Sequence, residues 1–339
     1  MGFCNVTSVP FRSSDVHCWE IRCTPYCCLA PTTSCVDTSR AGKPPEAASM
    51  RIVSLLPSAT EIVCALGAHQ RENSQLVGIS HSCDFPPGIC DRPVLTSTRV
   101  PVHKSQRDID QFVRQELAAS RGLYALDLEL LASLKADVIV TQTLCDVCAV
   151  SSGDVYQAVA SLPGDCKLVE LAPSKLEDVY GDIIRVGDAV GARSEALTLV
   201  AQLRTRAEAV EQQQILIGEK VLFLEWLEPP FSGGHWIPDL IHLLGGHSCL
   251  VESGQRSGTL SWEAIAECDP DIIIVGCCGY SKAESEQALM LLAHHPQWLL
   301  LRAVRHGRVI VGDGNAHFSR AGPRLIDGLE RLAAELSVR

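Results

Sequence analysis

Short apolar runs alternate with amphipathic stretches along most of this chain, after a long N-terminal extension without such a pattern. The run 51–56 predicts a buried strand, and Pro57 ends it. The residues that follow predict a helix that ends at Gly67. Ser58 and Glu61 have the spacing of a capping box, so we expect their side chains to cap this helix.

The alternation continues to residue 171 and restarts at residue 220. In the first region the expected strands are 76–80, 93–95, 137–140 and 168–171, and the expected helices are 109–120, 128–134 and 155–160. In the second region the expected strands are 220–226, 272–275 and 308–311, and the expected helices are 238–244, 262–267, 283–292 and 323–336. Such alternation is typical of parallel sheets with helices on both faces.

The pattern between the two regions is helical over 175–190 and 194–214, with a break at Gly191. We expect these residues to form a nearly continuous, rigid connector. The predicted fold class is therefore α/β, with two Rossmann-like lobes of parallel sheet joined by a long backbone helix and a ligand cleft between the lobes. The expected parts are a disordered extension, an N-terminal lobe, connecting helices and a C-terminal lobe, at 1–49, 50–173, 174–214 and 215–339.

Composition narrows the class of protein. The net charge of −11 argues against a nucleic-acid surface, and no apolar run reaches the roughly 20 residues of a membrane span. Six of the sixteen cysteines precede residue 50, in a segment that lacks the apolar stretch of a secretory signal. We therefore expect reduced thiols in the folded part, and a cytoplasmic or undefined location.

Polar, thiol and aromatic side chains follow several of the expected strands. In open parallel sheets, ligands bind outside the carboxyl ends of the strands. The segments that lie there are 81–84, 142–148, 228–236, 276–280 and 313–318. Because they come from both regions, a cleft between two lobes would collect them.

Two of these segments contain candidate metal ligands. Cys145 and Cys148 have the spacing of a metal knuckle or a redox pair, although two buried thiols in a loop are about as consistent with the sequence. Together with His81 and Cys83 they make a Cys3His set, which fits tetrahedral zinc if the four side chains converge.

Several short motifs, in the order in which they occur, resemble those of the class III periplasmic binding proteins. These proteins are the helical-backbone receptors for cobalamin, heme and iron–siderophore complexes. The resemblance covers about residues 51–336 and is closest to the cobalamin-binding-like subgroup. The matching motifs are Ser-Leu-Leu-Pro-Ser-Ala-Thr-Glu at 54–61, Ser-His-Ser-Cys-Asp-Phe-Pro at 80–86, Gln-Thr-Leu-Cys-Asp-Val-Cys at 142–148, Glu-Trp-Leu-Glu-Pro-Pro-Phe at 225–231, Gly-His-Trp at 234–236 and Asp-Gly-Asn at 313–315.

The resemblance implies a ligand-binding protein that clasps cobalamin, another corrinoid or another metal-containing ligand between its lobes. Trp226, Phe231 and Trp236 would supply apolar surface, and His81 or His235 would supply an axial donor to cobalt. The full set of ligand-binding candidates is His81, Asp84, Arg99, Glu225, Trp226, Phe231, His235, Trp236 and Asn315.

Two other functions remain open from the sequence. The Cys83, Cys145, Cys148 and His81 set would make the chain a binding protein for a zinc-like ion, or thiol or metal chemistry would make it an enzyme of unknown substrate. The expected partner is a small metal-containing ligand and not a nucleic acid. Partnership with an ABC permease is in doubt, because no signal peptide or lipobox cysteine is seen.

Overall fold

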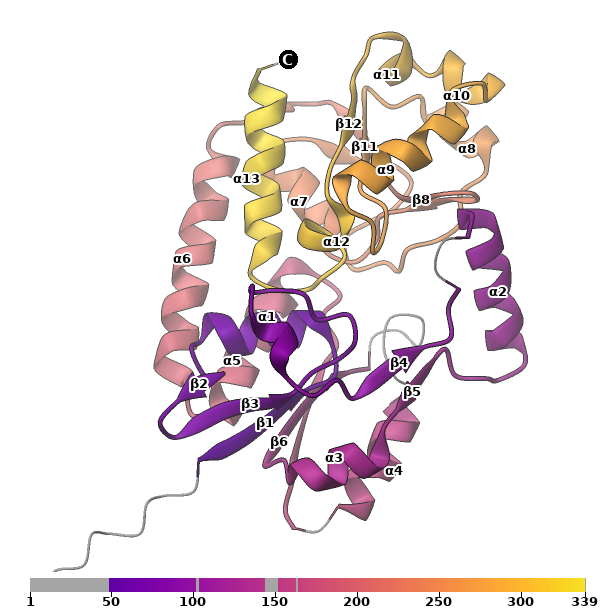
Figure 1. Ribbon diagram of the computed structural model, residues 1–339. Helices are drawn as coiled ribbons and strands as arrows, with labels where there is room; N and C mark the ends of the chain where they lie inside the picture. The colour runs from indigo at the N-terminus through magenta and orange to yellow at the C-terminus, as the bar shows by residue number, and fades with distance from the viewer. Residues whose placement is uncertain (1–48, 102–103, 144–151, 163, 339) are drawn as a thin grey trace, which may run out of the picture. The chain divides into compact units, whose positions relative to one another are not determined.

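The computed structural model describes residues 49–101, 104–143, 152–162 and 164–338. Almost all of the expected extension at 1–49 lies outside these residues, as do Cys145 and Cys148. The described chain contains two separate, mainly parallel sheets flanked by helices (Figure 1). The α/β fold with two parallel-sheet lobes is therefore confirmed, while the domain boundaries expected at 173 and 214 stay predictions.

The first sheet has the strand order β2-β3-β1-β6-β7 and is parallel except where β2 pairs with β3. Its strands are β1 (Met50–Ser54), β2 (Gln70–Arg71), β3 (Ser74–Gly78), β6 (Val138–Gln142) and β7 (Lys167–Leu171). One face packs on α1 (Pro57–Ala65) and α5 (Leu176–Ala189). The other face packs on α3 (Leu128–Leu134) and α4 (Ser152–Ser161). Helices on both faces explain why these strands read as continuous apolar runs.

The second sheet has the order β10-β8-β11-β12, with β9 added antiparallel to β8. Its strands are β8 (Lys220–Leu227), β9 (Pro230–Ser232), β10 (His247–Ser248), β11 (Ile272–Val275) and β12 (Val309–Val311). One face packs on α7 (Ile237–Leu243) and α13 (Arg324–Ser337). The opposite face packs on α8 (Trp262–Cys268), α9 (Lys282–Leu289), η2 (Met290–Leu292), α10 (Pro296–Leu300) and α11 (Arg302–Arg305).

The connector between the sheets is two helices rather than one nearly continuous rod. Helix α5 ends before Gly191, which has a left-handed φ of +67°, and α6 (Arg193–Glu211) then packs back against α5. A methyl group on Gly187 would come within 2.5 Å of the Ala196 Cβ, so small residues allow this close contact. The expected backbone helix is present as α6 alone.

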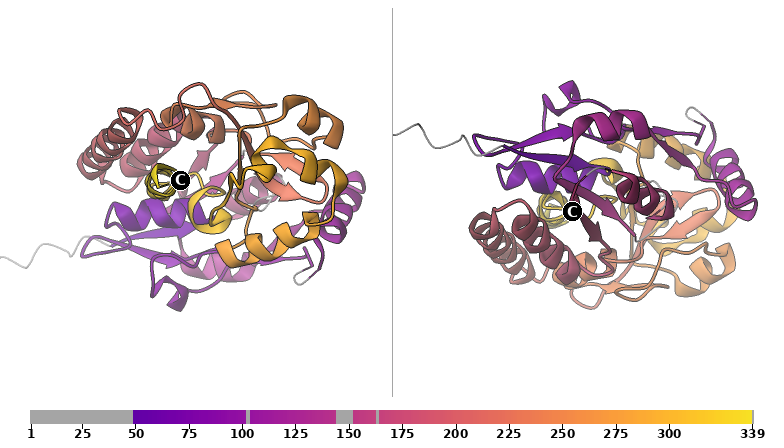
Figure 2. Two further views of the ribbon diagram at one scale, coloured as in Figure 1. Left: turned by 90° about the horizontal axis from the view of Figure 1, so that it is seen from above. Right: turned by 90° about the horizontal axis from the view of Figure 1, so that it is seen from below.

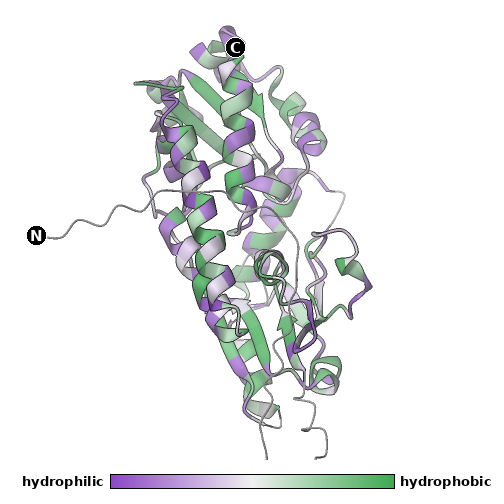
Figure 3. Ribbon diagram, turned by 90° about the vertical axis from the view of Figure 1, so that its left-hand side faces the viewer, coloured by the Kyte–Doolittle hydropathy of each residue, from purple (hydrophilic) through white to green (hydrophobic). Residues whose placement is uncertain are grey.

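One hydrophobic core runs from the first sheet to the second. It joins Ile52 and Val140 of the first sheet to Val221 and Ile274 of the second by way of the helices between them. Helix α13 packs beside α6 in this core (Figure 2). The helix that ends at the C-terminus, α13, mixes hydrophilic and hydrophobic residues, whereas the strands are mostly hydrophobic (Figure 3). We conclude that α6 and α13 bury one side each and expose the other.

The predicted capping box at the start of α1 is wrong. Leu56 occupies the N-cap position and makes no side-chain cap hydrogen bond, and Pro57 takes the first turn. Ser58 and Glu61 are both buried instead. The carboxylate of Glu61 turns toward Arg320, which is far away in the sequence, so a local capping rule could not describe it.

Three further elements lie between β3 and β6 in the chain. Strands β4 (Thr96–Thr98) and β5 (Tyr124–Leu126) form a small antiparallel pair, and α2 (Gln106–Ala118) lies between them in sequence. The strand expected at 93–95 is only an isolated bridge from Val94 to Ile79. Helix α2 also contacts β8 of the second sheet.

Candidate functional site

The carboxyl edge of the second sheet contains a topological switch point. Strand β8 leads by way of β9 to α7 on one face, while its neighbour β11 leads to α9 on the opposite face. Connections that diverge in this way open a space at the strand ends, where ligands bind in such sheets. Trp226 at the end of β8 and Tyr280 after β11 meet there, with ring centroids 5.5 Å apart.

The first sheet has an equivalent switch. Strand β1 leads to α1 on one face, and its neighbour β6 leads to α4 on the opposite face. The loop after β6 contains Cys145 and Cys148 and lies outside the described residues. The loop after β3 is described, and it carries His81, Cys83 and Asp84.

The His81 ring is held by the hydroxyl of Thr96. The Thr96 Oγ1 lies 2.7 Å from His81 Nδ1 and also accepts the backbone N–H of His81 at 3.0 Å. The Thr96 hydroxyl donates its own proton to Ser80 Oγ at 3.2 Å. When Thr96 accepts from His81, Nδ1 carries the hydrogen and Nε2 keeps its lone pair.

The surroundings of His81 are aromatic and partly buried. The ring centroid of Tyr124 lies 5.6 Å from that of His81. Burial lowers the pKa of His81, which favours the neutral imidazole. Arg99 is exposed and is already engaged, with an ion pair to Glu116 at 2.9 Å. Of His81 and Arg99, His81 is the one with a ring nitrogen, Nε2, that has no partner within the described part of the chain.

Helix α2 connects the first lobe to the Trp226 region of the second. The buried side-chain oxygen of Gln106 accepts from the backbone N–H of Leu227 at 2.7 Å, and the backbone carbonyl of Gln106 accepts from Trp226 Nε1 at 3.2 Å. Arg107 adds an exposed ion pair with Glu228 at 3.1 Å. The strand end of the second lobe is thus covered on one side by a helix that belongs, in sequence, to the first.

Two more predicted ligand residues flank Trp226. Glu225 is half-buried, and its carbonyl accepts from the backbone N–H of Cys278 at 2.9 Å, which joins the two loops at the switch point. Phe231 of β9 is half-buried, and the guanidinium of Arg114 from α2 lies 5.9 Å from its ring centroid. Trp226, Tyr280 and Phe231 therefore give this edge several partly exposed aromatic rings.

A network of charged side chains joins the two lobes at Arg320. Its guanidinium donates to Glu61 at 2.9 Å, to Asp84 at 2.5 and 2.9 Å, and to Asn315 at 2.8 Å. The Asn315 amide also donates to Asp84 at 3.1 Å. The predicted ligand residues Asp84 and Asn315 therefore come together, but they bind Arg320 and each other.

The network also affects the ionisation of its carboxyl groups. Burial raises the pKa of Glu61, although Arg320 and Arg324 act in the opposite direction. The pKa of Asp84 is lowered, because the bonds from Arg320 and Asn315 outweigh its partial burial. Arg324 additionally stacks over Phe85, with its guanidinium carbon 4.1 Å from the ring centroid.

The Asp-Gly-Asn motif at 313–315 has a local structural role that helps to build this network. Asp313 caps α12 (Gly314–His317) by accepting from the backbone N–H of Ala316 at 2.7 Å. A Cβ on Gly314 would collide with the carbonyl of Cys277, so only glycine fits there. These two requirements place Asn315 beside Arg320.

Trp236 does not offer the apolar ligand surface that its sequence context suggests, and His235 packs against it. Trp236 is buried, and its Nε1 donates to the carbonyl of Phe318 at 2.9 Å. Trp236 was predicted to line the ligand surface, but an indole whose N–H has a partner also packs well in a core. The His235 ring stacks at 5.6 Å on Trp236 and is half-buried, with a buried Nδ1 that has no partner among the described residues.

The predicted metal set is described only in part. The Cys83 thiol is buried and lies 3.0 Å from the Thr60 hydroxyl, and burial raises its pKa to about 11. Within the described residues, no three His, Cys, Asp or Glu side chains are grouped to hold a metal ion. Because Cys145 and Cys148 lie outside that part, the four-ligand site stays a prediction.

Several residues that build the site gave no recognisable signal in the sequence. In the sequence, Gln106 looks like an ordinary polar residue near the start of a helix. Thr96 lies in a stretch for which neither a strand nor a helix was predicted. Arg320 follows the Asp-Gly-Asn motif closely, but nothing in its neighbourhood predicts a partner in the first lobe. For Tyr280, the one indication in the sequence was its position at the end of the strand-end segment 276–280.

Comparison with known proteins identifies the family. The family model described as "Periplasmic binding protein" matches residues 52–316, so the chain belongs to this family. It is therefore a substrate-binding protein built from two parallel-sheet lobes and a backbone helix, as the sequence motifs suggested. None of the described helices combines the length and apolarity needed to cross a bilayer.

Two curated proteins are similar over most of their length. An uncharacterised ABC transporter substrate-binding lipoprotein, YvrC of Bacillus subtilis, is 24% identical over 295 residues, covering 84% of this chain and 79% of the relative. A vitamin B12-binding protein of Photorhabdus laumondii is 23% identical over 295 residues, covering 86% of this chain and 89% of the relative.

Solved structures show the same fold. The periplasmic heme-binding protein BhuT, in complex with two hemes, has a TM-score of 0.64 at 19% identity, covering 86% of this chain and 98% of BhuT. The periplasmic vitamin B12-binding protein BtuF of Vibrio cholerae has a TM-score of 0.60 at 18% identity, covering 86% of this chain and 97% of BtuF.

The expectation of a cytoplasmic or undefined location is wrong. The family consists of periplasmic binding proteins, and the relatives are named as lipoproteins or periplasmic proteins, which work outside the cytoplasm. The expectation rested on the missing apolar segment near the start of the chain. The absence of such a segment does not determine where a binding protein of this family works.

Proposed function

We propose that this chain binds a corrinoid at the carboxyl edges of its two sheets, with His81 as the axial donor to the metal of the ligand. The observation that carries the proposal is the hydrogen bond between His81 Nδ1 and Thr96. A histidine that binds a metal usually donates its other ring N–H to a fixed acceptor, which sets the tautomer and the ring orientation. Thr96 performs this role here, and Nε2 is left to coordinate.

Aromatic side chains support a flat, largely apolar ligand. Trp226 and Tyr280 lie at the switch point of the second sheet, and Tyr124 lies beside His81 in the first lobe. Ligand sites are typically lined by aromatic side chains with a few placed polar groups. A corrin ring has apolar faces and amide groups at its margin, and both kinds of surface suit these residues.

The charges at this edge favour a corrinoid over heme. Heme carries two propionate groups that need cationic partners. The arginines here are paired with carboxylates, namely Arg99 with Glu116, Arg107 with Glu228, Arg114 with Asp110, and Arg320 with Glu61 and Asp84. The described residues thus offer little free positive charge to propionates, whereas the amides of a corrinoid need none. The vitamin B12-binding relative is consistent with this preference.

A transport role would follow from the same proposal. The Bacillus subtilis relative is named as a substrate-binding lipoprotein of an ABC transporter. We therefore include delivery of the ligand to an ABC permease in the proposal. Co-purification of the full chain with a permease from its own cell is the direct test, and recovery of the ligand without any permease would remove this part.

The test of corrinoid binding is a visible-light titration of the full chain with hydroxocobalamin, with hemin as the comparison ligand. Replacement of cobalt-bound water by an imidazole should change the cobalamin spectrum at a stoichiometry of one. The His81→Ala variant should lose this spectral change, and the His235→Ala variant should keep it. Protein purified from its own cell should contain cobalt and show corrinoid absorption.

Two results would reject the proposal. One is saturable binding of hemin with no binding of hydroxocobalamin. The other is an unchanged cobalamin spectrum in His81→Ala, which would mean that His81 does not coordinate. If His235→Ala alone loses the signal, the axial donor comes from the second lobe instead.

A further inference from the structure

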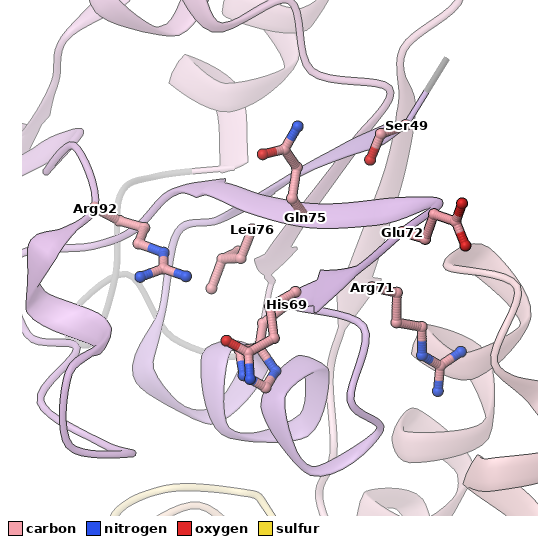
Figure 4. A pocket seen from close by; sticks show the side chains of 8 residues that line it. Ser49, His69, Arg71, Glu72, Gln75, Leu76 and Arg92 are labelled. Atoms are coloured by element: carbon pink, nitrogen blue, oxygen red, sulfur yellow. The ribbon is translucent and has the colours of Figure 1, made fainter. Parts of the chain in front are cut away.

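A surface pocket of about 470 Å³, widely open to solvent, lies at the edge of the first sheet, away from the proposed ligand site (Figure 4). Its walls include His69, Gln75, Leu76 and Arg92, together with the β2 strand. Gln75 and Leu76 belong to the amino-terminal half of β3, whereas His81 follows the carboxyl end of that strand. The pocket and the proposed corrinoid site therefore use different ends of β3.

Arg92 brings an unused positive charge to this pocket. Its side chain is half-buried, and its guanidinium has no hydrogen-bond or ion-pair partner among the described residues. In Figure 4 the guanidinium of Arg92 extends from its loop toward Leu76 and His69. A guanidinium offers five N–H donors in a planar fork that matches the geometry of a carboxylate or phosphate group.

His69 adds an unpartnered polar atom. Its Nδ1 is buried and has no hydrogen-bond partner within the part of the chain that the structure describes. Burial and the positive charge of Arg92 both lower the pKa of His69, which shows that the guanidinium acts on this ring. An anion bound to Arg92 would offset its positive charge near this ring.

The second arginine of the pocket is already committed. Arg71 forms an ion pair with Glu195 at 2.8 Å and donates to the carbonyl of Leu66. Glu72 is exposed at the rim. The charge left to attract a ligand is therefore that of Arg92, while Arg71 fixes the opposite wall of the pocket.

We propose that this pocket is a second binding site, specific for a small molecule that carries a carboxylate or phosphate group. The oxyanion accepts two hydrogen bonds from the guanidinium of Arg92 and lies beside the His69 ring. The volume leaves room for a molecule larger than the oxyanion itself. This site is independent of the corrinoid proposal, because it shares no residue with it.

The test is calorimetric titration of the full chain with inorganic phosphate and, separately, with acetate at constant ionic strength. Wild-type protein should bind at least one of them saturably with a stoichiometry of one. Arg92→Gln should weaken binding by about tenfold or more, the size expected for loss of charge-assisted hydrogen bonds. Arg305→Gln removes the same charge from an exposed position and should leave binding unchanged.

A second readout separates the site from general charge effects. The His69 ring signals in an NMR titration should move on saturation with the anion, and in Arg92→Gln they should not move. Tighter binding of phosphate indicates a phosphorylated ligand, tighter binding of acetate indicates a carboxylate, and either result supports the site. Absence of saturable binding, or equal weakening in Arg92→Gln and Arg305→Gln, overturns it.

Discussion

Arg320 of the second lobe donates a hydrogen bond to Glu61 of the first lobe across 2.9 Å, and both side chains are almost completely buried. The two residues are 259 positions apart in the chain. Glu61 lies in the first helix after β1, and Arg320 lies between α12 and α13. The pair therefore ties the carboxyl edges of the two sheets at a point beside the predicted ligand residues.

Substitution of Arg320 by Met should destabilise the protein by about 3–5 kcal/mol, because it leaves the Glu61 carboxylate buried without its main partner. Urea denaturation measures the loss as a lower midpoint. The double variant Glu61→Met/Arg320→Met should recover most of it, since the buried carboxylate is removed together with its partner. As a control, Arg107→Met breaks the exposed inter-lobe pair with Glu228 and should cost less than about 1 kcal/mol. Equal losses in both arginine variants would show that Arg320 is not special.

Substitution of Thr96 by Val should weaken hydroxocobalamin binding by roughly 10- to 100-fold, the usual effect of losing a group that orients a metal-binding histidine. Valine has the same shape but cannot accept from His81 Nδ1, so the ring loses its fixed tautomer. The dissociation constant from the visible titration measures the effect. Thr98→Val changes an exposed position of the same strand and should bind normally. Identical affinities of the two variants would remove Thr96 from the site.

The strands and helices were largely predictable because they bury continuous or periodic apolar residues. Leu128–Leu134 is a helix as expected, and the strand expected at 137–140 is Val138–Gln142. The short antiparallel strands were missed where they contain polar residues, as at Thr96–Thr98. Such strands depend on pairing with distant residues, and a local pattern does not contain that information.

The candidate site was predictable only in outline. Strand ends identified His81 and Trp226, because the position of loops in a parallel sheet follows from the alternation itself. The partners of these side chains did not follow, since Thr96, Gln106 and Arg320 act through long-range hydrogen bonds. The same limit produced the wrong capping box, where a local rule assigned Glu61 to its own helix.

Alkylation of the native protein should distinguish exposed thiols from buried ones. Cys90 and Cys278 are exposed and should react first with iodoacetamide at pH 8. Burial raises the pKa of the buried Cys249 and Cys277, so these should react only after unfolding, and it raises the pKa of the partly exposed Cys64 to about 12, so Cys64 should react slowly. Peptide-resolved mass spectrometry over time gives the order. Early modification of Cys277 would contradict its burial in the loop after β11.

Asp182 should make the stability of the protein fall as the pH rises from about 4 to about 6. Its side chain is buried in α5, and burial raises its pKa from 3.8 to about 6, although its ion pair with Arg185 acts in the opposite direction. In this range the folded state keeps a proton that the unfolded state has lost, so unfolding releases a proton and becomes easier as the pH rises.

The shift corresponds to roughly 3 kcal/mol between the two ends of that range. The Asp182→Asn variant has no titrating group there, so its free energy of unfolding should depend less on pH by about this amount. Urea denaturation at several pH values between 4 and 7 measures the difference from wild type. Asp188→Asn changes an exposed carboxylate that is paired with Arg193, and its curve should run parallel to that of the wild type. If the Asp182→Asn curve also runs parallel, the buried carboxyl group is not protonated in the folded state.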